Sequence, residues 1–140
     1  CLERTLYNGV ISGMSMDGGR FFYPNPLSSD GKYAFNADNT KTRQPWFGCA
    51  CCPSNLCRFI PSVPGYLYGV KDNNIYVNLF AANTSTIQVG GKDVVLEEST
   101  QYPWDGDIQI RVVKSAAKNA NLLVRIPGWV QNQVLPSDLY

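Results

Sequence analysis

The second half of the chain alternates apolar and polar residues in short runs, as half-buried β-strands do. These runs occupy residues 75–80, 84–89, 94–99, 107–114 and 122–126. Clusters of glycine, asparagine and aspartate separate them, and Gly90-Gly91 lies between two runs that fit a hairpin. Four or five short strands with such turns predict an antiparallel sandwich or half of one.

The beginning of the chain has the spacing of a helix instead. Leu2, Leu6 and Val10 recur along one helical face, so we expect residues 1–10 to be the end of an amphipathic helix. The pair Asn8-Gly9 is a stop signal and predicts that the helix ends there.

Between this helix and the cysteines, turn-forming residues alternate with aromatic ones. The turn signal Asp17-Gly18-Gly19 followed by Phe21-Phe22-Tyr23 predicts a hairpin-like stretch with a buried strand, although these rings could also form a platform for a sugar. Residues 28–45 are rich in asparagine, aspartate, serine and glycine, so we expect a long loop there. Loops of this length often carry function.

Three cysteines, Cys49, Cys51 and Cys52, fall within four positions, directly before Pro53. Proline is favoured at the first position of a helix, so we expect Cys52 to be the N-cap of a short helix and Cys51 to precede it. The positive end of the helix dipole would lower the pKa of both thiols and favour thiolate, the form that binds metal or acts as a nucleophile. The pattern predicts a reactive or metal-bound cysteine pair.

Cysteine can also serve only to fill the core, because the free thiol is among the most buried side chains. We expect that role for Cys57, which is off the helical face of Cys52, and for Cys1. A disulfide between Cys51 and Cys52 is disfavoured, because neighbouring residues fit disulfide geometry poorly. After the cysteines, Pro61 and Pro64 predict that the helix breaks or kinks.

Composition excludes several classes of function. The 140 residues fit one domain of ordinary size, and 12 basic against 11 acidic residues give a net charge of +1, so nothing indicates a nucleic-acid or anionic-membrane partner. No apolar run is long enough to span a membrane. Histidine is absent, which excludes Ser-His-Asp and Cys-His catalysis within the chain and zinc motifs that need histidine.

The five cysteines are odd in number and clustered, which argues against a secreted disulfide framework. Their clustering indicates a reducing environment or metal binding. No signal peptide is visible, and the sequence predicts no localisation. The chain begins with Cys1 inside a plausible helix, so we expect it to be a piece of a longer protein.

The character of the sequence changes near residue 73. We expect residues 1–72 to form a mixed, helical and loop-rich part that holds the cysteines, and residues 73–140 to form a β part. The expected fold class is therefore mainly β with a short helical part.

Three motifs together resemble one enzyme family: residues 2–9 (LERTLYNG), 21–27 (FFYPNPL) and 51–55 (CCPSN). Their order and spacing are similar to those of the β-L-arabinofuranosidases of glycoside hydrolase family 127. The resemblance implies that residues 1–72 are the C-terminal part of a catalytic (α/α)6 barrel. Residues 73–140 would be the start of a β-sandwich domain.

The resemblance also implies an activity, the retaining hydrolysis of β-L-arabinofuranosyl groups with a zinc-bound cysteine nucleophile. The partners would be an arabinose-containing oligosaccharide or glycoconjugate and the rest of the same polypeptide. A thiolate would take the place of the usual nucleophilic carboxylate. Zinc would keep the sulfur deprotonated.

Carried onto this chain, the family's site makes Cys51 the nucleophile and a zinc ligand, and Cys52 a second zinc ligand. Tyr23 matches a tyrosine that contacts the sugar, and Glu3 is expected as a carboxylate close behind the site. The remaining glutamate and cysteine ligands and the acid/base glutamate lie upstream in the family. The zinc ligand set in this chain is therefore expected to be incomplete, and the chain alone is expected to be inactive.

Two other classes of function compete with an enzyme. The chain could be a scaffold whose cysteines are structural, or a non-catalytic sandwich that binds carbohydrate. The aromatic residues that could stack on sugars in such a sandwich are Tyr76, Tyr102, Trp104 and Trp129. We expect these rings to lie in the core instead.

Overall fold

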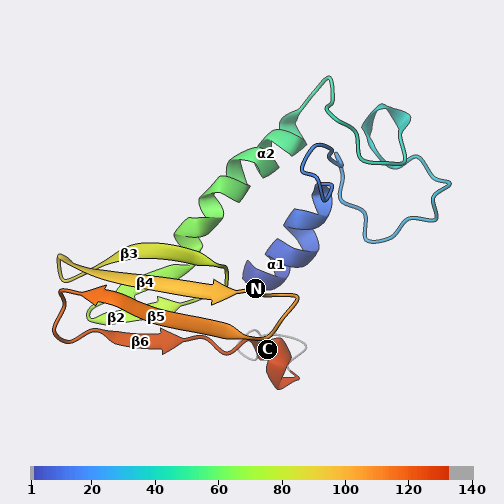
Figure 1. The fold of residues 1–140 in the computed structure, drawn as a ribbon. Helices are drawn as coiled ribbons and strands as arrows, with labels where there is room; N and C mark the ends of the chain where they lie inside the picture. Colours follow the sequence, from blue (N-terminus) through green and yellow to red (C-terminus); the bar gives the residue numbers. More distant parts are fainter. Residues whose placement is uncertain (1, 133–140) are drawn as a thin grey trace. The chain divides into compact units, whose positions relative to one another are not determined.

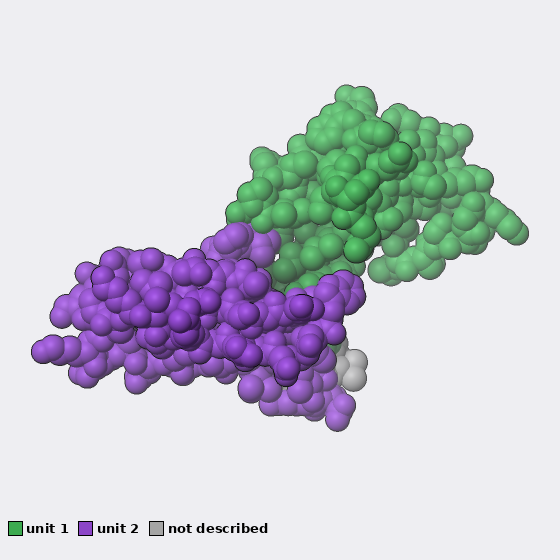
Figure 2. Space-filling view, viewed as in Figure 1, with its two compact units in different colours: residues 1–62 green, residues 63–140 purple. Residues whose placement is uncertain are grey.

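The structure is a computed structural model, and it describes residues 2–132. The chain forms two compact units, which divide between Ser62 and Val63 (Figure 2). Strands dominate and the helices are short, which confirms the expected fold class (Figure 1). The division lies ten residues before the domain boundary expected at residue 72, and that boundary stays a prediction.

The first unit begins with helical backbone, as the sequence predicts. Helix α1 spans Leu2–Thr5 and continues as a π-helical turn, η1 (Leu6–Val10), and a 3-10 turn, η2 (Ile11–Gly13). The predicted stop at Asn8-Gly9 is wrong. The Asn8 side chain donates a hydrogen bond to the Arg4 carbonyl (2.9 Å), so the asparagine supports the helical turn rather than ending it.

A turn and a long loop follow. Hydrogen bonds that belong to no helix or strand connect their residues. Gly18 has a φ of +73° at the predicted turn. The predicted buried strand is wrong, because Phe21 forms only isolated bridges, to Met14 and to Gln44. The expected loop at 28–45 is confirmed, with one short 3-10 turn, η3 (Ala37–Asn39).

Helix α2 spans Cys51–Phe59 and passes into the 3-10 segment η4 (Ile60–Tyr66), which confirms that the prolines end the helix. The predicted N-cap is wrong by two residues, since Ala50 caps the helix. Pro53 is then the third helical residue, where the backbone N–H also has no intrahelical partner. The Leu56 side chain packs against Gly13, where an added Cβ would lie 3.0 Å from it.

The second unit contains two three-stranded sheets. One sheet has the order β1 (Tyr68–Lys71), β2 (Asn74–Val77) and β6 (Asn121–Val124). Strand β1 was not expected from the sequence. The expected antiparallel arrangement holds for β1 and β2, whereas β6 runs parallel to β2.

The other sheet is an antiparallel meander of β3 (Asn83–Val89), β4 (Lys92–Thr100) and β5 (Ile108–Ser115). The hairpin predicted at Gly90-Gly91 is confirmed. Both glycines have positive φ, +57° and +73°, which a two-residue turn of this kind needs and which glycine adopts without strain.

The core of the second unit is built by side chains from both sheets. Ile75 on β2 packs with Ile87 and Val89 on β3 and with Val94 and Leu96 on β4. Because one buried cluster joins the two sheets, they form the two layers of a sandwich-like unit (Figure 1).

The predicted core position is wrong for two of the four aromatic residues that were considered as stacking surfaces for sugars. Trp104 is 86% exposed, in the turn after β4, and Trp129 is about half exposed in the short 3-10 turn η5 (Gly128–Gln131). Tyr76 and Tyr102 are half-buried. Within residues 2–132, no helix has the length and apolar character needed to cross a membrane.

Candidate active site at the start of helix α2

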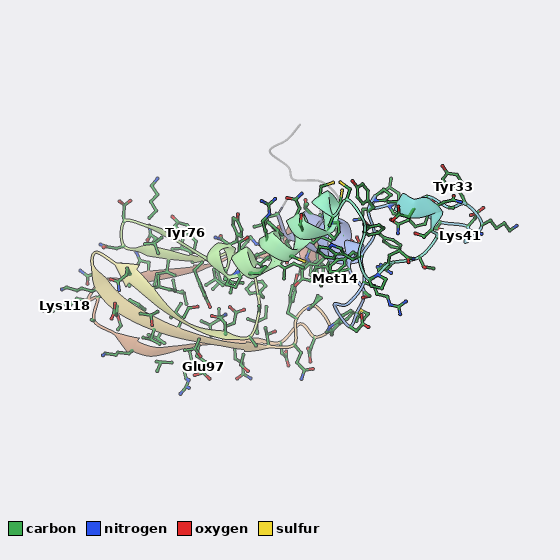
Figure 3. All side chains as sticks on the ribbon, turned by 90° about the horizontal axis from the view of Figure 1, so that it is seen from above. Met14, Tyr33, Lys41, Tyr76, Glu97 and Lys118 are labelled. Carbon is green, nitrogen blue, oxygen red and sulfur yellow. The ribbon has the colours of Figure 1, made fainter. Side chains whose placement is uncertain are left out.

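The cysteine pair occupies the first two positions of α2. The helix start is held by side chains of its own first turn, because Ser54 Oγ (3.1 Å) and Asn55 Nδ2 (2.7 Å) both donate to the Cys51 carbonyl. Pro53 is buried beneath the turn. Sulfur atoms, drawn in yellow, gather at this end of α2 in Figure 3.

Tyr23, from the distant aromatic run, completes a cluster with these thiols. Its hydroxyl lies 2.8 Å from Cys51 Sγ and 3.9 Å from Cys49 Sγ. The sulfurs of Cys51 and Cys52 are 3.8 Å apart, and all three cysteines are free thiols. The structure thus brings together three site residues expected from the sequence, Tyr23, Cys51 and Cys52.

The position of Tyr23 is fixed by two residues that were not expected from the sequence. Its backbone N–H donates to Asn36 Oδ1 (2.7 Å), and its ring makes an edge contact with Phe47 at 5.4 Å between centroids. Both residues are buried. The sequence offers no signal that separates Asn36 from the other asparagines of its loop.

The hydrogen bonds of the cluster shift the thiol and phenol pKa values in opposite directions. The Tyr23 hydrogen bond is the main cause that lowers the pKa of Cys51, and the neighbouring Cys52 thiol lowers it further. The same bond raises the pKa of Tyr23, with a smaller contribution from Cys49. The arrangement therefore favours a thiolate at Cys51 next to a protonated tyrosine.

The expectation of a lowered pKa for both thiols holds for Cys51 alone. Partial burial is the main cause that raises the pKa of Cys52, and the hydrogen bond with Cys51 adds to it. The thiol nearer the solvent and nearer Tyr23 is thus the more acidic of the two. In the absence of a metal, Cys51 is the better nucleophile of the pair.

The cysteine pair has the spacing of two ligands on one tetrahedral zinc ion. Two sulfurs bound to zinc at about 2.3 Å lie roughly 3.8 Å apart, and the Cys51 and Cys52 sulfurs have that separation, 3.8 Å. Residues 2–132 contain no group of three or more cysteine, aspartate or glutamate side chains placed to hold a metal. The pair would fit two corners of a tetrahedral zinc site, and such a site would need its other ligands from elsewhere.

The remaining predictions concern Glu3, expected close behind the site, and two cysteines expected in the core, Cys57 and Cys1. Glu3 lies on α1 and is buried, and it contributes, after burial, to raising the pKa of Tyr7. The expected core position of Cys57 is wrong, since it lies exposed on α2. Cys1 lies outside the described residues.

Comparison with known proteins identifies both parts of the chain. Residues 1–65 match the family model for the β-L-arabinofuranosidase GH127 catalytic domain, and residues 74–137 match that for the GH127 middle domain. A non-reducing end β-L-arabinofuranosidase of Bifidobacterium longum subsp. longum is 36% identical over 136 residues. That alignment covers 91% of this chain and 20% of the relative.

Solved structures agree. A GH127 β-arabinofuranosidase is 56% identical with a TM-score of 0.84, covering 99% of this chain and 20% of that chain. A GH127 β-L-arabinofuranosidase from Geobacillus stearothermophilus T6 is 41% identical with a TM-score of 0.77, covering 91% and 21%. The chain spans about a fifth of the length of these relatives. It belongs to glycoside hydrolase family 127, as a fragment with parts of the catalytic and middle domains.

Proposed function

We propose that the protein from which this chain comes is a retaining β-L-arabinofuranosidase, with Cys51 as its nucleophile. The observation that carries the proposal is the 2.8 Å contact between the Tyr23 hydroxyl and Cys51 Sγ, in a thiol pair at the start of a helix. The relatives named as β-L-arabinofuranosidases support the sugar specificity. An arabinose-containing oligosaccharide or glycoconjugate is the proposed substrate.

The residues of this chain would act in both halves of a double displacement. In the first half, the Cys51 thiolate attacks the anomeric carbon and forms a C–S bond, while the glycosidic C–O bond breaks. An acid from another part of the protein protonates the leaving oxygen. In the second half, water gives up a proton to that group's conjugate base and its oxygen displaces the Cys51 sulfur as thiolate.

Tyr23 would contribute to this reaction in two ways. When Cys51 is a thiolate, the Tyr23 hydroxyl, 2.8 Å away, would donate to its sulfur, which orients the nucleophile and holds it as thiolate. The same residue matches the family tyrosine that contacts the sugar. Tyr23 would thereby fix the distance between the sulfur and the anomeric carbon.

Zinc is the proposed cofactor, and Cys51 and Cys52 would hold it together with ligands from the rest of the protein. Bound there, it would stabilise the thiolate charge. Glu3, buried on α1, is proposed as a carboxylate close behind this site.

The configuration of the first product tests the reaction. Proton NMR of early time points with an aryl β-L-arabinofuranoside is expected to show β-L-arabinofuranose before it equilibrates. The α-anomer as first product would overturn the retaining mechanism. Full activity in a Cys51→Ser variant would overturn the assignment of the nucleophile.

A second candidate function, binding of carbohydrate by the second unit, is favoured by the exposure of Trp104. An exposed indole is a common stacking surface for a sugar ring. Loss of oligosaccharide affinity in a full-length Trp104→Ala variant with unchanged turnover of a small aryl glycoside would support it. Unchanged affinity would exclude Trp104 as a stacking surface.

A further inference from the structure

We propose that Asn36 is a positioning residue for the reaction, because it sets the place of the Tyr23 hydroxyl beside the Cys51 sulfur. The inference rests on the proposed function of Tyr23 and Cys51 and assigns a role to a residue of the long 28–45 loop. Asn36 would act only through Tyr23.

The Asn36 side chain joins two separate backbone segments. Its Oδ1 accepts the Tyr23 N–H (2.7 Å), and its Nδ2 donates to the Thr42 carbonyl (2.9 Å). The residue is only 4% exposed, so both bonds are shielded from competing water. One carboxamide therefore fixes the loop to the backbone of the tyrosine.

The loop is closed on itself at the same point. The Asn36 N–H donates to the Thr40 carbonyl (3.0 Å), and Thr40 Oγ1 donates to the Ala37 carbonyl (3.1 Å). Asn36 thus belongs to a small, internally bonded loop. A backbone group attached to such a loop has less freedom than one attached to an open loop.

The chain around Tyr23 is fixed at three successive points. Phe21 exchanges two backbone hydrogen bonds with Gln44, each 2.8 Å, and Phe22 N–H donates to the Gly13 carbonyl (2.8 Å). The next N–H in the chain, that of Tyr23, donates to Asn36 Oδ1. Phe47 then limits the rotation of the Tyr23 ring by its edge contact.

Asparagine suits this position because it is short, accepts with one atom and donates with the other. Alanine would leave the Tyr23 N–H and the Thr42 carbonyl without this partner. Aspartate would keep the acceptor for Tyr23 and lose the donor to Thr42. Aspartate is therefore the conservative replacement with respect to Tyr23.

The test is a double-mutant cycle in the full-length enzyme, with kcat and KM measured for Asn36→Ala, Tyr23→Phe and the double variant. Asn36→Ala is expected to lower kcat on the order of tenfold or more, since small displacements of a reacting group are costly. In the Tyr23→Phe background the same substitution is expected to change kcat less than twofold. Such non-additivity marks residues that act as one unit.

Thr40→Val is the matched control, because it removes a hydrogen bond of the same loop without contacting Tyr23. It is expected to lower the melting temperature and to lower kcat much less than Asn36→Ala does, because the Asn36 bond to the Tyr23 N–H stays in place. Asn36→Asp, which keeps the Tyr23 bond, is expected to retain more of kcat than Asn36→Ala. If Asn36→Ala does not fold, Asn36→Asp replaces it in the cycle. The expected loss of kcat is then smaller, and it is again expected to disappear in the Tyr23→Phe background.

The outcomes separate this inference from the proposed function. If Tyr23→Phe lowers kcat and the effects of the two substitutions on kcat multiply independently, the inference about Asn36 is overturned and the role of Tyr23 stands. If Tyr23→Phe leaves kcat unchanged, the role proposed for Tyr23 fails, and the inference with it. A loss of kcat in Thr40→Val equal to that in Asn36→Ala would reduce Asn36 to a general stabiliser of the loop.

Discussion

The hydroxyl of Tyr23 lies 2.8 Å from the sulfur of Cys51, across 28 positions of sequence. Neither residue is brought there by a shared helix or strand. Tyr23 is held by the Asn36 side chain of the loop, and Cys51 by side chains at the start of α2. The contact depends on how the loop folds against the residues before it, so it can be broken without touching the helix.

Removal of the Tyr23 hydroxyl is expected to impair catalysis without unfolding the protein. In full-length Tyr23→Phe, kcat should fall on the order of tenfold to hundredfold, because the thiolate loses a charge-assisted hydrogen bond and its fixed orientation. Tyr33→Phe is the control, since Tyr33 is an exposed tyrosine of the 28–45 loop (Figure 3). Equal kcat values for the two variants would contradict the role of Tyr23.

The cysteine variants are expected to divide into three groups. Cys51→Ser should abolish turnover, because a serine hydroxyl stays protonated and is a poor zinc ligand. Cys52→Ser should lower zinc content and activity together. Cys57→Ser should change neither zinc content nor activity. In the 140-residue chain, where Cys57 is exposed, the free energy of unfolding should stay within about 0.5 kcal/mol of the wild type.

The measurement is kcat beside zinc stoichiometry for each full-length variant. Cys49→Ser removes the weaker, 3.9 Å contact of Tyr23 and is expected to leave zinc content unchanged. Near wild-type kcat in Cys51→Ser, together with loss of activity in Cys49→Ser or Cys57→Ser, would show that the nucleophile has been misassigned.

In the second unit, Glu98 is expected to make stability fall as pH rises. It is only 2% exposed and accepts hydrogen bonds from the Ala81 N–H and the Tyr68 hydroxyl, both 3.1 Å. Burial raises the pKa of Glu98 above its ordinary value of 4.5, more than these bonds lower it. The folded state therefore binds the proton more tightly, so the stabilisation is complete below pH 4.5 and is lost as pH rises through the raised pKa.

Glu98→Gln removes the charge and keeps the shape. The amide can still accept from Ala81 and can donate to the Tyr68 hydroxyl, so we expect a gain of about 1 kcal/mol at pH 7.5 that is absent at pH 4. Urea unfolding of both proteins at the two pH values checks this. A gain of the same size at both pH values, or none at pH 7.5, would contradict a buried carboxylate that titrates on unfolding.

The isolated 140-residue chain is expected to show no glycosidase activity and only weak zinc binding. Its described part supplies two thiols with zinc spacing, and no group of three or more side chains there is placed to hold a metal. Zinc needs four ligands for a stable tetrahedral site. Turnover of an aryl β-L-arabinofuranoside by this chain alone, or one tightly bound zinc per chain, would contradict the expectation.

The sequence predicted the elements whose signals are local. The Gly90-Gly91 turn and the strands on either side of it follow from neighbouring residues. Strand β1 was not predicted, because it is only four residues long, contains Gly69 and follows a proline-rich 3-10 segment. The parallel pairing of β6 with β2 could not be predicted, because nothing in either strand specifies its partner.

For the candidate site, the sequence predicted three side chains that the structure brings together, but not the residues that hold them in place. Cys51, Cys52 and Tyr23 stand out by residue type and by motif. Asn36 does not, since its role depends on a fold of the loop that its neighbours do not reveal. The core position predicted for Cys57 is wrong because helical spacing shows only that Cys57 is off the face of Cys52. It does not show whether other residues bury the side chain.

The parallel pair of β2 and β6 has a consequence for biosynthesis. Asn74 and Asn121, which pair at one end of these strands, are 47 positions apart, and the whole β3–β5 meander is made between them. As the chain leaves the ribosome, β1 and β2 are complete well before β6, and until then the outer edge of β2 is an open template for other strands. The meander, built from neighbouring strands, can fold first, so closure of the other sheet is expected to be the late and aggregation-sensitive step.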